Sequence, residues 1–355
     1  INDFTTNGPV LGDNDSFGRS IANIGDLNDD GVADIVVGAP EDDRCVDNTN
    51  NCWNRGAIHI MFMNSDGSMD STVEINDFTT NGPVLQNQDK FGISVANIGD
   101  LNGDGVNDIV VGASEADCVA CTGSNSGAVY IMFMNRDGSV DETVEINDST
   151  TNGPVIIATD GLGFSVADIG DLNADGVNEI AVGAYKDDGS GTERGAVHIM
   201  FMNTDGTIDS TVEINDSTNG PVLANDDLFG SSIETIGDWD GDGINDIVVG
   251  AYHDNGLGSN RGAVHIMFMV GTTVEEPKKY NRTMYPPHIH DKVTVTINSN
   301  EEFNLNLKDR EIAKITSRVG DTVDITISVG DDKKLYQISQ IKLITNFAKK
   351  PSGMN

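Results

Sequence analysis

The residues of this sequence that could do chemistry gather in a nine-residue loop that occurs four times. Every copy follows the pattern D-x-[N/D]-x-D-G-x-x-[D/E], which sets oxygen-bearing side chains at positions one, three, five and nine. Short side chains at alternate positions of a tight turn converge on one point, and the glycine at position six permits the bend. The oxygen-bearing residues are Asp26, Asn28, Asp30 and Asp34; Asp100, Asn102, Asp104 and Asp108; Asp171, Asn173, Asp175 and Glu179; and Asp238, Asp240, Asp242 and Asp246.

Such a set of oxygens is typical of a calcium site. The backbone carbonyl of the seventh residue can complete it, from Val32, Val106, Val177 and Ile244. Six or more hard oxygens in a flexible arrangement suit Ca²⁺ better than Mg²⁺, which takes fewer protein ligands in near-octahedral order. An EF-hand is excluded because it needs Glu at position twelve, where the four copies have Val37, Val111, Val182 and Val249. We therefore predict about four calcium ions, one for each copy.

The alternative reading of the loop is an Asx-rich turn that holds no metal. Four copies in register disfavour it, because each gathers carboxylates that would repel one another without a cation. The third copy departs most from the pattern, since Glu179 is one methylene longer than the aspartates at the same position. Asn64, Asp66, Asp70 and their copies could form a second cation site, but they also suit Asp-Gly hairpin turns, which need no metal.

The loop belongs to a longer repeat. The first aspartates of successive loops are 74, 71 and 67 residues apart. A Phe-Gly pair precedes three of the loops, Leu162-Gly163 precedes the third, and a Gly-Ala pair follows all four. A later block ends in Ile-Met-Phe-Met, and Thr-Val-Glu-Ile-Asn-Asp stands between repeats. We place the four repeats at about 1–74, 75–145, 146–213 and 214–274.

Each repeat is predicted to form four short strands. In the first repeat these are Ser20–Ile24, Asp34–Gly38, Ala57–Met63 and Thr72–Ile75. Strands such as the second are β-branched and continuously apolar, which indicates burial on both faces. A repeat of about 70 residues with four strands and tight turns has the size of one propeller blade. The high content of Gly, Asn and Asp and the lack of a 3.6-residue period exclude a helical repeat.

These blocks resemble a known repeat. Phe-Gly before the loop, the loop itself and Gly-Ala-Pro40 after it are similar to the FG-GAP repeats of the integrin α-chain β-propeller. The Gly-Ala-Val-His-Ile-Met-Phe-Met block resembles the secreted prokaryotic members of that class. The resemblance covers roughly residues 1–270 and implies a β-propeller with calcium on loops at one rim, and a role in adhesion or cell-surface assembly. Departures are Leu162 in place of Phe, and Ser114, Tyr185 and Tyr252 in place of Pro40.

Four repeats are fewer than propellers of this family usually have. Residues 1–9 duplicate residues 75–83, whereas the last repeat decays over residues 270–276. We hypothesise that the N-terminal segment completes a ring, either within one chain or between chains of a polymer. A long exposed sheet edge would otherwise invite aggregation.

A second domain is predicted from a change in composition. Residues 1–274 hold eight of the 21 Lys and Arg residues, and residues 275–355 hold the other thirteen. Prolines mark a linker at 275–287. Alternating segments at 292–297, 303–307, 323–327 and 340–344 then favour a small immunoglobulin-like β-sandwich over 288–355. Whether that domain continues beyond Asn355 is left open.

The charge of the chain bears on its partners. It has 57 acidic residues against 21 basic ones and a formal charge of −36. Such a surplus disfavours nucleic acid and anionic membranes, which are recognised through Lys and Arg. No window approaches the ~18 apolar residues of a membrane span. We expect other copies of the chain, surface proteins or glycans as partners, with no direct membrane span in this chain.

Four cysteines fall into two close pairs in polar loops of successive repeats. Without nearby histidines they indicate short disulfides, and hence an oxidising, extracellular compartment. Zinc is the alternative, but a single pair of cysteines lacks the second pair of ligands that a structural zinc site needs. The pairs are Cys45 with Cys52 and Cys118 with Cys121. The N-glycosylation pattern, which also occurs by chance, is present at Asn14, Asn147, Asn215 and Asn281.

The histidines are interpreted mainly as structural. His59, His198 and His265 share one repeat position, where the second copy has Tyr130, and a position that accepts Tyr favours packing over ligation. His288 and His290 lie on one side of a predicted strand. A copper or zinc site there is the alternative to a structural role, although two ligands alone make weak support.

The motifs H-E-x-x-H, G-x-S-x-G and G-x-x-x-x-G-K-[S/T] do not occur in the sequence. We therefore interpret the chain as a secreted calcium-binding structural or adhesive cell-surface protein and not as an enzyme. A subunit of an extracellular filament or surface layer is one form of this hypothesis. The alternative is a calcium-dependent hydrolase or lyase that acts on extracellular polysaccharide through carboxylates in the propeller channel, because such enzymes leave no short motif.

Overall fold

The computed structural model describes residues 1–43, 53–117, 125–189, 191–255 and 260–270, together with four short strands between residues 292 and 326. The chain divides into two compact units, Ile1–Glu275 and Glu276–Asn355. In the second unit β16 (Lys292–Thr296) pairs with β19 (Thr322–Thr326), and β17 (Glu302–Leu307) pairs with β18 (Arg310–Thr316). The rest of the predicted sandwich and the predicted linker lie outside the described residues.

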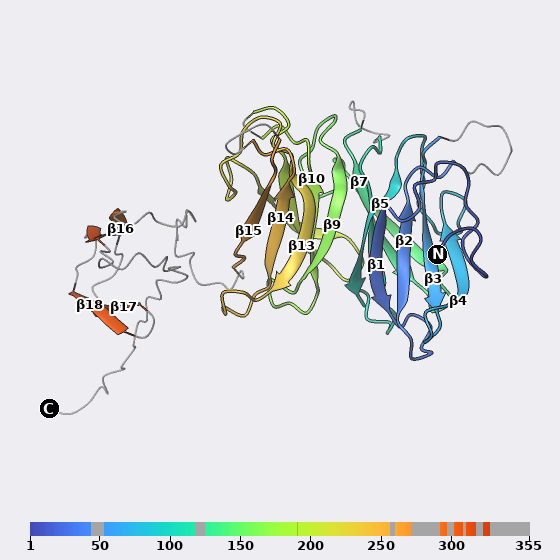
Figure 1. Ribbon diagram of the computed structural model, residues 1–355, viewed down its shortest axis with the longest axis horizontal. Helices are drawn as coiled ribbons and strands as arrows, with labels where there is room; N and C mark the ends of the chain where they lie inside the picture. Colours follow the sequence, from blue (N-terminus) through green and yellow to red (C-terminus); the bar gives the residue numbers. More distant parts are fainter. Residues whose placement is uncertain are drawn as a thin grey trace. The chain divides into compact units, whose positions relative to one another are not determined.

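The first unit consists of four antiparallel sheets, one for each sequence repeat (Figure 1). Strands follow one another across each sheet in chain order. Blade 1 contains β1 (Ser20–Gly25), β2 (Asp34–Ala39), β3 (Ala57–Met63) and β4 (Met69–Ile75). Blade 2 contains β5 (Phe91–Gly99), β6 (Asp108–Ala113), β7 (Ala128–Met134) and β8 (Val140–Ile146). Blade 3 contains β9 (Leu162–Gly170), β10 (Glu179–Ala184), β11 (Ala196–Met202) and β12 (Ile208–Ile214).

Blade 4 contains three strands in the part of the chain that the structure describes. These are β13 (Phe229–Gly237), β14 (Asp246–Ala251) and β15 (Ala263–Met267). The first strands of successive blades lie next to one another, β1 beside β5, β5 beside β9 and β9 beside β13. This is the arrangement of a propeller, and it confirms the predicted all-β fold with four blades. Among the described residues, no helix is long and apolar enough to cross a membrane.

The hydrophobic core lies between the blades. Each of three clusters joins strand three of one blade to strand two of the next. Because both faces of an interior blade are covered in this way, its central strands are apolar at consecutive positions. The residues that meet are Ile58 and Ile60 with Ile109 and Val111, Val129 and Ile131 with Ile180 and Val182, and Val197 and Ile199 with Ile247 and Val249.

The first strands are longer in blades 2 to 4 than the sequence predicts. They begin at the aromatic or leucine residue of the Phe-Gly pair, whereas β1 begins only at Ser20. The reason is a parallel bridge to the preceding blade, Gly56 to Phe91, Gly127 to Leu162 and Gly195 to Phe229. A contact between blades therefore extends the strand, and a pattern read within one repeat does not include that contact.

The N-terminal segment lies against blade 1. The carbonyl of Asn7 accepts a hydrogen bond from Thr72 Oγ1 at 2.9 Å. The carbonyls of Asn81 and Asn152 accept equivalent bonds from Thr143 and Thr211 at 2.7 and 2.8 Å. The segment thus occupies the same place on blade 1 that the segments joining successive blades occupy on blades 2 and 3. The described contacts of this segment are with blade 1, so closure of a ring through blade 4 stays a prediction.

Candidate metal sites on the blade loops

The four acidic loops each connect the first strand of a blade to its second strand. Because these strands run in the same sense in every blade, all four loops lie at one end of the propeller. The glycine at position six has a left-handed backbone in every copy, with φ between 86° and 91°. A side chain at that position would be strained, which explains why the loop keeps glycine there.

In the first loop backbone amides hold the acidic side chains. The carboxylate of Asp26 accepts hydrogen bonds from the N–H groups of Asp30 and Gly31 at 2.9 and 2.7 Å. Asn28 Oδ1 accepts from the same Asp30 N–H at 3.0 Å, and Asp30 Oδ1 accepts from Val32 at 2.8 Å. Asp100, Asp171 and Asp238 accept the corresponding pair of bonds in the other loops. The chain itself therefore orients the predicted ligands.

The ninth-position aspartates tie three of the loops to strand three or, in blade 4, to Met269 just after it. Asp34 is fully buried, and its two carboxylate oxygens accept from the N–H groups of Leu27 and Met63, both at 3.0 Å. Asp108 and Asp246 make the equivalent two bonds. A cation bound at these oxygens would thus be coupled to the sheet as well as to the loop.

Glu179 holds this position in the third loop and differs from the aspartates. One of its oxygens accepts from Leu172 N–H at 2.5 Å, whereas Oε1 is buried without a hydrogen-bond partner among the described residues. An unsatisfied buried carboxylate oxygen is unfavourable. A bound cation would satisfy it, so this residue fits the predicted calcium ion.

Three carboxylates come close together in two of the loops. The ligand atoms of Asp171, Asp175 and Glu179 lie within 4.8 Å of one another, as do those of Asp238, Asp240 and Asp246. Two oxygens bound to one Ca²⁺ at 2.3–2.6 Å are at most ~5 Å apart, so both groups fit a single ion. The third loop, which departs from the sequence pattern, is one of the two.

Burial makes negative charge unfavourable in these loops. It raises the pKa of Asp108 to about 6 and, helped by the neighbouring charges of Asp175 and Asp171, that of Glu179 to about 7. The pKa of Asp34 is also raised, with burial as the largest cause. A divalent cation would offset this cost, and it is the chemical species that the donor set suits.

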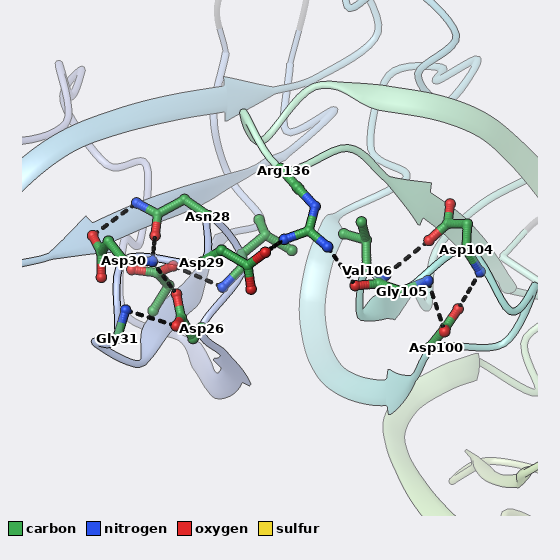
Figure 2. Close-up of polar contacts among 12 residues, drawn as sticks. Asp26, Asn28, Asp29, Asp30, Gly31, Asp100, Asp104, Gly105, Val106 and Arg136 are labelled. Carbon is green, nitrogen blue, oxygen red and sulfur yellow. Dashed lines mark hydrogen bonds and ion pairs between the residues drawn. The ribbon is translucent and has the colours of Figure 1, made fainter.

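Arg136 connects two of the loops, and sequence analysis missed it. It lies on the turn between β7 and β8, where its guanidinium pairs with Asp29 of the first loop and donates to the carbonyl of Gly105 in the second at 3.2 Å (Figure 2). The other turns have Ser65 and Thr204 at this position. Both partners are well exposed, so the ion pair stabilises only weakly, but it joins neighbouring candidate sites.

A buried aspartate before the Phe-Gly position was also missed. It occurs once in each repeat, and its side chain accepts the backbone N–H three residues earlier. The residues are Asp15, Asp89, Asp160 and Asp227. The D-x-[F/L]-G spacing around them could have shown them, because a polar residue repeated at the edge of a strand often closes a turn. They lie at the ends of the strands away from the calcium loops.

Substitution of Asp89 is predicted to give a pH-dependent gain in stability. Burial, together with the charges of Asp117 and Glu145, raises its pKa to about 7, although the Gln86 N–H opposes this. The native state then binds more protons than the unfolded state between about pH 4 and pH 7, so stability falls as pH rises through that range. Asp89→Asn keeps an acceptor for Gln86 and removes the charge. At about 1.4 kcal/mol per pKa unit, its unfolding free energy should exceed the wild-type value by a few kcal/mol at pH 8.

Urea unfolding of both chains at pH 4 and pH 8 measures this effect. The gain should disappear at pH 4, where wild-type Asp89 is protonated in the native state. Asp66→Asn is the control, because Asp66 is exposed and its hydrogen bond to Ser68 lowers its pKa. An Asp89→Asn difference that is equal at both pH values would show that the charge does not cause it.

Some of the residues predicted as glycosylation sites, disulfides or structural histidines lie in the described part of the chain, and others lie outside it. Asn14 is exposed, Asn147 is half-buried, and Asn215 is buried with its Oδ1 accepting from Ser217 N–H at 2.8 Å. His59 and His198 are fully buried. The remaining predicted residues lie outside the described part of the chain, so the predictions on them stand as made: Cys45, Cys52, Cys118, Cys121, Asn281, His288 and His290.

Comparison with known proteins identifies the repeat. The family model described as FG-GAP repeat matches residues 17–60, 91–132 and 164–200. These segments fall in the first three of the four repeats and each contains one acidic loop. The structural copy in blade 4 has the same loop and strand order.

The chain is also similar to integrin α chains. It is 35% identical to integrin alpha-6 of Gallus gallus over 173 residues, 48% of this chain and 14% of the relative. It is 29% identical to integrin alpha-5 of Xenopus laevis over 252 residues, 68% of this chain and 20% of the relative. It is 30% identical to integrin alpha-PS5 of Drosophila melanogaster over 168 residues, 47% of this chain and 15% of the relative. The matches therefore span no more than a fifth of these relatives.

Proposed function

We propose that this chain, whose repeats are FG-GAP repeats in a four-bladed β-propeller, is a secreted calcium-binding structural or adhesive protein of the cell surface. One calcium ion in each loop would rigidify one end of each blade. The observation that carries the proposal is the set of four loops in register, each with a buried ninth-position acid bonded to its own loop. Calcium in this role is structural, because it joins loop to sheet.

The likeness to integrin α chains supports an extracellular, adhesive role. It extends over the propeller and a small part of the relatives' length, so the partners remain part of the proposal. We expect other copies of the chain, surface proteins or glycans, in a filament or surface layer. The formal charge of −36 favours partners that tolerate or bridge negative charge through calcium.

Binding and turnover assays on the same preparation test this function. Purified protein should adhere to protein- or glycan-coated surfaces in millimolar calcium, and adhesion should fall to background with EGTA. A quadruple loop variant, Asp26→Asn, Asp100→Asn, Asp171→Asn and Asp238→Asn, should behave like the chelated wild type. Glu142→Gln on β8 is the control, because this exposed acid lies outside the loops.

The enzymatic alternative predicts another outcome in the same assays. It requires calcium-dependent release of reducing ends or unsaturated products from polysaccharides, abolished by one acidic substitution outside the loops. Such turnover would overturn the structural role. Adhesion that is equal in calcium and in EGTA would overturn the role of the loops.

A further inference from the structure

The contact between successive blades uses the same positions three times. The forward face of a blade, which we define as the face toward the next blade, presents a leucine from the calcium loop and two apolar residues of strand three. In blades 1 to 3 these side chains are at most 5% exposed. They are Leu27, Ile58 and Ile60; Leu101, Val129 and Ile131; and Leu172, Val197 and Ile199.

Blade 4 exposes the same positions to solvent. Val264 is 73% exposed, Ile266 is 38% exposed, and Trp239 stands at the leucine position and is 62% exposed. They come from β15 and from the fourth calcium loop, so they lie on one forward face. Exposed apolar residues that share one face are typical of a protein–protein contact.

Backbone contacts between blades follow the same rule. The hydroxyl of a strand-one serine donates to the carbonyl of the Phe-Gly glycine in the next blade, from Ser20 to Gly92 at 2.8 Å, and from Ser94 to Gly163 at 2.7 Å. Ser165 donates to Gly230 at 2.7 Å in the same way. The same glycine carbonyl also lies against the strand-two glycine of the preceding blade, so closely that a Cβ on that strand-two glycine would not fit. A Cβ on Gly38, Gly112 or Gly183 would be 1.9–2.0 Å from it.

Blade 4 keeps the strand-one serine and the strand-two glycine, although no Phe-Gly carbonyl of a following blade contacts them among the described residues. Gly250 corresponds to Gly38, but the three atoms nearest to a Cβ there belong to the side chains of Ser231 and Ser232, and none is a backbone atom of another blade. Its φ is not in the left-handed region, so local backbone geometry does not require glycine. Ser232 corresponds to the donating serines and is exposed. The forward face of blade 4 is thus shaped for the Phe-Gly backbone of another blade.

Blade 1 offers the complementary surface. Ile21 is 63% exposed, whereas its equivalents Val95, Val166 and Ile233 are 7–8% exposed in the contacts with the preceding blades. Phe17 is half-buried, whereas Phe91 and Phe229 are fully buried. A Cβ on Gly18 would meet nothing within 4 Å, whereas one on Gly92 would lie 2.5 Å from the carbonyl oxygen of Ala57 in the preceding blade. This rear face of blade 1 has the features that a forward face contacts.

We propose that the forward face of blade 4 docks on the rear face of blade 1 in a second copy of this chain. Residues 271–355 contain no fifth copy of the acidic loop pattern. A head-to-tail contact of this kind gives a closed ring or an open filament, according to its rotation. The proposal rests on the proposed function in one respect only, as it names the surface by which surface-layer or filament subunits would associate.

The contact between copies should be weaker than the contacts within the chain. Asn107, Asn178 and Asn245 each donate a side-chain hydrogen bond to the preceding blade, to the carbonyls of Ile24, Ile98 and Ile169. Blade 1 has Ala33 at this position and cannot make that bond. Association between copies is therefore reversible and rises with protein concentration.

Sedimentation of two singly blocked variants tests the proposal. Val264→Asp blocks the forward face of blade 4, and Ile21→Asp blocks the rear face of blade 1. Each should associate at least about tenfold more weakly than wild type, because docking would bury an unpaired charge. Mixed together they should form a 1:1 dimer and nothing larger, since one open face of each kind remains. Gly250→Ala should also weaken association, because its methyl group would meet the docking Phe-Gly carbonyl. Within blade 4 the nearest atoms to this methyl group belong to serine side chains.

The control is Val222→Asp, at an equally apolar and 84% exposed linker residue outside both faces, which should associate like wild type. A wild-type chain that stays monomeric at every concentration overturns the proposal. So does a mixture of the two blocked variants that fails to dimerise. Calcium binding is measured on the same samples by isothermal titration, so the docking surface can fail while the calcium loops are upheld.

Discussion

Removal of calcium by EGTA is expected to lower the melting temperature of the propeller unit by about 20–40 °C. The physical reason is that calcium would bind the folded loops and not the unfolded chain. At a calcium concentration a hundred times the dissociation constant, each site adds about 2.7 kcal/mol, so four sites add about 11 kcal/mol. A unit of this size shifts by about 2–4 °C for each kcal/mol.

Without a cation, the loops are also destabilised by their own buried carboxylates. Burial raises the pKa of Asp108 and Glu179, and Glu179 Oε1 has no hydrogen-bond partner among the described residues. Chelation leaves these carboxylates charged and close together above pH 7. Magnesium is the control ion and should restore only a small part of the stability, because it tolerates this ligand set poorly. A melting temperature that is equal in EGTA and in calcium would contradict the structural role of the metal.

Addition of one methyl group at Gly112 is expected to prevent the propeller from folding. A Cβ at this position would lie 1.9 Å from the carbonyl oxygen of Gly163 and 2.8 Å from its carbon. Both atoms belong to the backbone of blade 3, so no rotamer change relieves the overlap. Blades 2 and 3 would have to separate and expose the core between them, at a cost above about 4–5 kcal/mol.

The matched control for this substitution lies in the same chain. Gly250→Ala makes the same chemical change at the same repeat position, where the three nearest atoms belong to serine side chains. It should change the midpoint of urea unfolding only slightly, whereas Gly112→Ala should yield insoluble or unfolded protein by circular dichroism. Equal effects of the two substitutions would mean that the blades do not pack as described.

The sequence predicts a large part of this fold because the repeat shows it four times. A loop such as Asp26–Asp34 is recognisable within one copy, since its ligands and its turn glycine are close in the sequence. Its strands are equally local, because the apolar run of β2 reflects burial on both faces. The comparisons confirm the FG-GAP repeat that these patterns indicate.

The features that sequence analysis missed depend on contacts between blades or on burial. Arg136 stands in a turn that looks solvent-exposed, and only the packing of blade 2 on blade 1 brings it to Asp29. Asp89 and its equivalents look like ordinary turn residues until burial raises their pKa. Phe91 begins β5 because it bridges to Gly56 of the preceding blade. For Arg136 and Phe91 the partner lies in another repeat, so a pattern within one repeat cannot show the contact.

The most direct test of the central claim is a calcium titration of thermal unfolding for the wild type and for the quadruple loop variant with Asp26, Asp100, Asp171 and Asp238 changed to Asn. The wild-type melting temperature should rise steadily with the logarithm of calcium concentration once the sites begin to fill. The variant should stay near the value of the chelated wild type throughout. A variant that responds to calcium as strongly as the wild type would contradict the account, because calcium would then act somewhere other than the four loops.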